Sequence, residues 1–155
     1  QRFIEQRSDV LVYSSPVLDE DMEVTGPVTV TLFASTTARD TDFTAKLVDV
    51  NESGFARNLT DGIIRARYRN SRSSASFVDP GSVGEYTIDL WATSNVFLKG
   101  HCIRLEISSS NFPRFDRNLN TGGEIGKEEN FESALQTIHH SREYPSYVTL
   151  PLVPK

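Results

Sequence analysis

The sequence is poor in the residues that mark several common classes of protein. Only one of its 155 residues is a cysteine, Cys102, which excludes an internal disulfide. No apolar run approaches the ~20 residues that a membrane-spanning helix needs. Lys and Arg number 16 against 21 Asp and Glu, so the net charge is −5. This balance argues against the basic surface of a nucleic-acid-binding domain, and we expect neither a membrane nor a nucleic-acid partner.

Motifs for catalysis and for cofactor binding are equally scarce. Residues 81–84 (GSVG) lack the spacing of the Gly-x-Ser-x-Gly elbow of serine hydrolases and follow a Pro-Gly turn. The histidines are His101, His139 and His140, and the last two would point to opposite faces of a strand. One Cys and three His do not supply the paired ligands of structural zinc. We therefore expect no catalytic residue, metal or cofactor.

What the sequence does have is alternation of apolar and polar residues, which indicates strands with one buried face. The alternating segments are 9–13, 28–35, 63–69, 85–90, 103–107 and 148–152, and 44–50 carries apolar residues on both faces, which indicates a central strand. Turns are expected at 26–27, 51–54, 61–62, 79–81 and 99–100, where Gly, Pro, Asn and Asp gather. Residues 131–138 fit either a short helix or a strand. Seven or eight short strands predict an antiparallel β-sandwich in one domain.

Two clusters of charge have both a functional and a structural interpretation. Arg65, Arg67 and Arg69 would lie on one face of a strand, where they could bind phosphate or carboxylate. In an acidic chain, an acidic partner strand or a neighbouring domain is the better explanation. Asp40 and Asp42 could offer oxygens to calcium, but we favour the interpretation that they cap the turn before the next strand.

Residues 108–123 form a long segment with no strand pattern. Loops of more than about 12 residues without regular structure usually carry a function. The aromatic and charged side chains of this segment are Phe112, Arg114, Phe115, Asp116 and Arg117. Because aromatic and Arg side chains are enriched at packed interfaces, we predict ligand binding or packing against another domain here.

Four segments resemble the C-terminal domain of the CocE/NonD family of serine hydrolases, which includes cocaine esterase, α-amino-acid ester hydrolases and X-Pro dipeptidyl-peptidases. They are 40–50 (DTDFTAKLVDV), 61–69 (DGIIRARYR), 91–101 (WATSNVFLKGH) and 108–118 (SSSNFPRFDRN) followed by NTGG at 120–123. The resemblance extends over about residues 9–154 and implies a jelly-roll β-sandwich of galactose-binding-like fold. It also implies that this domain packs on an α/β-hydrolase domain and its helical cap, where the Ser-His-Asp triad lies.

On this resemblance, residues 1–155 are expected to be the single, non-catalytic C-terminal domain of a longer hydrolase. A domain docked on the active-site cleft can complete the pocket wall and exclude water. The expected docking residues are Asp40, Asp42, Phe43, Phe112, Arg114, Phe115, Asp116, Arg117 and Asn118. No cofactor is expected, an oligomer is compatible with the sequence, and the single cysteine favours the bacterial cytoplasm.

A carbohydrate-binding module is the alternative from another functional class. It would need exposed rings on a concave face, and the candidates are Tyr68, Tyr86 and Trp91. The strand parity of Tyr68 and Tyr86 places both on buried faces, which argues against this alternative. A plain structural or oligomerisation domain is the third possibility.

Overall fold

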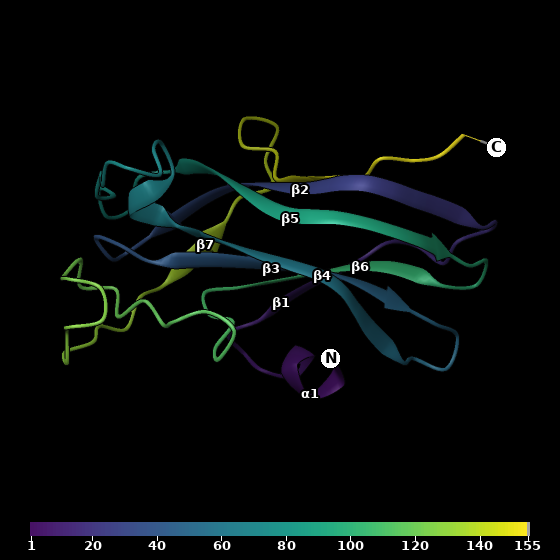
Figure 1. The fold of residues 1–155 in the computed structure, drawn as a ribbon, viewed down its shortest axis with the longest axis horizontal. Coiled ribbons are helices and arrows are strands. Elements are labelled where there is room, and N and C mark those ends of the chain that lie inside the picture. Colours follow the sequence, from purple (N-terminus) through teal and green to yellow (C-terminus); the bar gives the residue numbers. More distant parts are fainter. Residues whose placement is uncertain (155) are drawn as a thin grey trace.

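The computed structural model describes residues 1–154, which form two antiparallel β-sheets arranged as layers (Figure 1). Sheet A has the strand order β1-β6-β3-β4; sheet B has the order β5-β2-β7, and β8 also pairs with β2. The strands are β1 (Leu11–Ser14), β2 (Met22–Thr36), β3 (Asp42–Val50), β4 (Ala56–Arg65), β5 (Gly84–Phe97), β6 (Cys102–Ser108), β7 (Gln136–Ile138) and β8 (Tyr147–Thr149). The predicted all-β sandwich is confirmed, and the galactose-binding-like classification stays a prediction.

Helices are a minor part of the fold. They are the four-residue α1 (Arg2–Glu5) and the 3-10 helix η1 (Ala66–Tyr68). Neither helix in the described part of the chain is long and apolar enough to cross a membrane. Residues 131–138, for which the sequence left a helix or a strand open, contain the short strand β7.

The core lies between the two sheets, as the alternation predicts. Val30 and Leu32 of β2 stand opposite Ile88 and Tyr86 of β5, and all four side chains are buried. The Tyr86 ring meets Phe43 of sheet A at a centroid distance of 4.7 Å. Fully burying one large apolar side chain contributes roughly 1.5–3 kcal/mol, so this inner layer stabilises the pairing of the sheets.

One edge of the sandwich is closed by close contact between β4 and β5. A Cβ atom added at Gly62 would lie 2.1 Å from the carbonyl oxygen of Asp89, and the Thr60 hydroxyl donates to the carbonyl of Leu90. The turn predicted at 61–62 is therefore wrong, because both residues lie inside β4. Gly62 stands there because only glycine lets the two strands approach this closely.

The turn predicted at 26–27 is also wrong, because β2 continues through both residues. The register between β2 and β5 shifts between Pro27 and Thr29, which marks a β-bulge. A bulge tolerates proline, whose missing N–H breaks a regular ladder. On the other strand Trp91 takes a φ of 65°, and its N–H donates to the Asp89 carboxylate. The extra residue of the bulge is on β5, where Leu90 and Trp91 stand opposite Val28 alone.

The strand predicted over 63–69 ends early, at Arg65, and the chain continues into η1. The β2–β3 connection accepts hydrogen bonds from the backbone N–H groups at the start of this short helix. The Ala66 N–H donates to the carbonyl of Thr41, and the Arg67 N–H donates to the Asp40 carboxylate. Arg65, Arg67 and Arg69 consequently do not share one strand face, because the last two belong to or follow the helix.

Candidate functional site

The longest irregular segment of the chain, 109–135, connects β6 to β7 and lies at the end of the sandwich where β3 begins (Figure 1). Of the loop predicted over 108–123, residues 109–123 form the first part of this segment, and Ser108 ends β6. Its position brings it beside the β2–β3 connection and the end of β4. The β2–β3 connection, the start of β3 and the middle of β4 supply three aspartates whose side chains are buried, Asp40, Asp42 and Asp61.

Asp40 and Asp42 join the loop to sheet A. The Arg67 Nε donates to Asp40 at 2.7 Å, and Arg65 donates to both oxygens of Asp42 at 2.9 and 3.0 Å. Asn118 of the loop donates through Nδ2 to Asp40 at 2.8 Å and to Asp42 at 2.9 Å. The ion pair with Asp42 raises the pKa of Arg65. The acidic partner strand that the sequence predicts is present for Arg65, which pairs with Asp42 of β3, whereas Asp40, the partner of Arg67, lies in the β2–β3 connection.

A second anchor is formed by Asp61. Asn111 Nδ2 donates to Asp61 Oδ2 at 2.7 Å, and Arg114 Nη1 lies 2.8 Å from Asp61 Oδ1. The sequence did not single out Asp61 or Asn111, because Asp-Gly was taken as a turn. Buried carboxylates that keep several charge-assisted hydrogen bonds hold their partners firmly.

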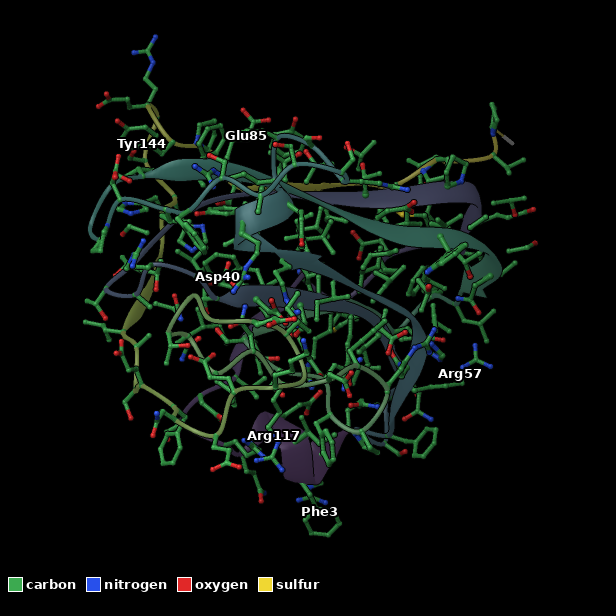
Figure 2. All side chains as sticks on the ribbon, turned by 60° about the vertical axis from the view of Figure 1, so that its left-hand side comes forward. Phe3, Asp40, Arg57, Glu85, Arg117 and Tyr144 are labelled. Carbon is green, nitrogen blue, oxygen red and sulfur yellow. The ribbon has the colours of Figure 1, made fainter. Side chains whose placement is uncertain are left out.

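The outer side of the loop carries aromatic rings beside guanidinium groups. The Arg117 guanidinium lies 4.6 Å from the Phe112 ring centroid, and that of Arg114 lies 5.6 Å from the Phe115 ring. Phe112 is 56% exposed, while Phe115 is half-buried and Asp116 is exposed. Figure 2 brings this end of the molecule forward, with Asp40 at mid-height left of the centre and Arg117 below it, above Phe3.

The structure divides the nine expected docking residues into two groups. The side chains of Asp40, Asp42 and Phe43 are at most 1% exposed, so they cannot form an outer contact surface. The physical reasons are that Phe43 packs in the core and that each aspartate pairs with an arginine. The remaining six residues belong to the loop, and we call these the docking segment: Phe112, Arg114, Phe115, Asp116, Arg117 and Asn118.

The hydrogen-bond partners of Asp40 and Asp42 argue against the calcium interpretation. Their carboxylate oxygens accept hydrogen bonds from Arg65, Arg67 and Asn118, so each negative charge already faces a cation. No cluster of three or more His, Cys, Asp or Glu within residues 1–154 is arranged to hold a metal ion.

The three histidines are held at different places by different partners. His101 Nδ1 lies 2.7 Å from Asp49, His139 Nε2 lies 3.2 Å from the Ser35 hydroxyl, and His140 Nε2 lies 3.0 Å from the Tyr13 hydroxyl. The expected separation of His139 and His140 agrees with these contacts, which lie on β2 and β1 respectively.

The rings considered for sugar binding do not form one platform. Tyr86 is fully buried against Phe43, and Tyr68 is half-buried. Trp91 is 67% exposed, although the sequence placed it at an apolar strand end. Its left-handed backbone at the bulge turns this residue out of the alternating pattern.

Comparison with known proteins places the chain in a family. Residues 2–149 match the model of the X-Pro dipeptidyl-peptidase C-terminal non-catalytic domain. The cocaine esterase of Rhodococcus sp. (strain MB1 Bresler) is 51% identical over 155 residues, which are 99% of this chain and 27% of that enzyme. The chain thus spans about a quarter of the length of this relative.

Two solved structures are similar to the chain in both fold and sequence. An aminopeptidase from the marine sediment archaeon Thaumarchaeota archaeon superposes with a TM-score of 0.94 at 33% identity. An α-amino acid ester hydrolase superposes with a TM-score of 0.93 at 32% identity. In both cases the match covers 99% of this chain and 27% of the other. The chain therefore belongs to the family of X-Pro dipeptidyl-peptidase C-terminal non-catalytic domains found in CocE/NonD-type hydrolases.

Proposed function

We propose that this domain docks on the catalytic part of a longer CocE/NonD-type serine hydrolase and helps to shape its active-site cleft. The parent reaction in this proposal is hydrolysis of an ester or amide by a serine nucleophile that lies outside residues 1–155. The relatives named above are an esterase, an aminopeptidase and an ester hydrolase, and each is about four times as long as the matched region. From the single cysteine we also propose the bacterial cytoplasm as its location.

The observation that carries the proposal is the construction of the docking segment. Its inner side is fixed by buried carboxylates, through Asn118 to Asp40 and through Arg114 to Asp61. Its outer side leaves Phe112 exposed with Arg117 stacked on it. Aromatic and arginine side chains provide most of the binding energy at many interfaces, and a surface that is ordered before binding loses less entropy on association.

The test uses the full-length hydrolase with single changes in the docking segment. Phe112→Ala and Arg117→Ala are expected to raise KM for a chromogenic ester and to separate thermal unfolding into two transitions. Phe55→Ala is the matched control, because Phe55 is also an exposed phenylalanine but lies in the β3–β4 hairpin at the opposite end of the sandwich (Figure 1). If all three variants behave like the wild type, the docking segment does not contact the catalytic part.

A separate measurement addresses the absence of catalysis in this domain. The purified 155-residue chain is expected to show no turnover of the same ester. Turnover that a serine-directed inhibitor abolishes would contradict the assignment of the nucleophile to another part of the polypeptide.

A further inference from the structure

The two edges of the sandwich differ, and the difference leaves a cavity in the fold. At one edge β4 and β5 touch at Gly62 and Thr60. At the other edge stand the short strands β1, β7 and β8, which have four, three and three residues. Strands this short do not close the gap between the sheets, and a cavity of about 380 Å³ lies there.

The walls of this cavity are almost entirely apolar. They include Val30, Leu32, Leu47, Leu105, Val148 and Leu150, which come from both sheets. Leu105, Val148 and Leu150 are only partly buried, so the cavity leaves apolar core surface without a partner. Concave apolar surface of this kind marks a ligand site more often than scattered exposed side chains do.

The polar side chains that line the cavity belong to tyrosine, serine and histidine residues. Tyr13 of β1 and His140, which follows β7, meet across the two sheets at 3.0 Å. Desolvation raises the pKa of Tyr13, which keeps its phenol a neutral hydrogen-bond donor. No Asp, Glu, Lys or Arg is among the described residues that line the cavity. A charged ligand would find no countercharge there, whereas a neutral ligand leaves no charge unpaired.

We propose that this inter-sheet cavity binds a neutral, mainly apolar small molecule, such as one aromatic ring with a short alkyl chain and one hydrogen-bond acceptor. A dry apolar cavity of about 150 Å³ is enough to hold benzene, and typical ligand pockets span about 300–1,000 Å³. In the tautomer in which His140 Nε2 donates to Tyr13, the Tyr13 hydroxyl proton is free for the acceptor of the ligand. This site is independent of the docking segment, because it lies along the β1–β8 edge of the sandwich.

The test titrates the 155-residue chain and the full-length protein with N-phenyl-1-naphthylamine, a neutral probe that fluoresces in apolar surroundings, and then displaces this probe with butyrophenone, which has one ring, a short alkyl chain and a carbonyl acceptor. Saturable one-to-one binding is expected in both. Leu105→Trp and Val148→Phe fill the cavity and are expected to weaken binding at least tenfold, about 1.4 kcal/mol or more. Their melting temperatures should stay near the wild-type value, because the added atoms occupy empty space. Val12→Phe is the control, since Val12 lies on β1 but does not line the cavity.

Three results would overturn the proposal. The first is no saturable binding to either protein. The second is equal binding by the wild type and by whichever filled variant remains folded by circular dichroism. The third is binding to the 155-residue chain but not to the full-length protein, which would mean that another segment of the polypeptide fills the cavity.

Discussion

The side-chain amide of Asn118 donates a hydrogen bond to the fully buried carboxylate of Asp40 at 2.8 Å. This bond connects a residue of the long loop to the interior of the sandwich. A neighbouring bond to Asp42 uses the same amide group, so both carboxylates depend on one side chain of the loop. The order of the loop is therefore coupled to the stability of the β2–β3 connection.

Replacing Asn118 by Leu is expected to lower the free energy of unfolding by about 1–3 kcal/mol. The new side chain fills a similar volume but removes one hydrogen bond from each of two buried carboxylates, which keep only their arginine donors. Urea denaturation measures the loss, and limited proteolysis should show faster cleavage within 109–135. The control is Asp116→Asn, which changes an exposed residue of the same loop. Equal protease resistance of Asn118→Leu and wild type would show that the loop is ordered by other contacts.

Replacing Arg67 by Met is expected to be more damaging, by about 3–5 kcal/mol, because Asp40 would remain charged and buried without its cation. The double variant Arg67→Met with Asp40→Asn removes both charges and should recover much of the loss. Denaturation of the two single variants and the double variant gives the coupling energy. Additive effects in this cycle would contradict the dependence of Asp40 on Arg67.

The sequence predicted the sandwich well because strands that bury one face, such as β5, keep the alternation in the residue order, and β3, buried on both faces, carries apolar residues on both. The predicted segments 28–35, 44–50, 85–90 and 103–107 all lie inside observed strands. The two wrong turn predictions, at 26–27 and 61–62, have one cause. In the local sequence, a glycine inside a strand cannot be distinguished from a glycine in a turn. Only the approach of β5 to Gly62 shows which is present, and that contact joins residues distant in the chain.

The candidate site was only partly accessible from the sequence for a similar reason. The docking segment was found through its composition, which is local. Asp61 and Asn111 were missed because their contact spans 50 positions and leaves no periodic pattern. Asp40, Asp42 and Phe43 were predicted from a family resemblance. Such a resemblance identifies important residues but does not show whether their side chains are buried. Their side chains turn out to support the site from inside.

The close contact of Gly62 with β5 leads to a test that separates steric from conformational effects. Gly62→Ala should cost at least about 2–3 kcal/mol, because the new Cβ would clash with the backbone of Asp89 while its φ stays outside the left-handed region. Gly54→Ala is the matched control, since its φ is 79° and nothing lies within 4 Å of the added atom. Its cost should be about 1–2 kcal/mol, from the left-handed backbone alone. Chemical denaturation compares the two, and the opposite ranking would refute the closure at this edge.

The outer face of sheet A contains a buried acid that should make stability depend on pH. Glu106 is 3% exposed, and neither of its carboxyl oxygens has a hydrogen-bond partner. Desolvation is the main cause that raises its pKa from 4.5 to about 7; Lys46 and the N-terminal amine oppose the shift, and Glu5 of α1 adds to it.

Because the folded-state pKa of Glu106 lies above the unfolded value, the folded state holds its proton more tightly. The free energy of unfolding should therefore fall as pH rises from about 4.5 to 7 and stay low above that range, with a total contribution of about 2–3 kcal/mol. Glu106→Gln keeps the shape of the side chain, so it should remove this slope and exceed the wild type in stability at pH 8. Urea denaturation at pH 5, 6, 7 and 8 measures the effect, with exposed Glu85→Gln as the control. A Glu106→Gln profile parallel to that of the wild type would show that Glu106 is ionised in the folded protein throughout this range, and that the outer face of sheet A admits water to its carboxylate.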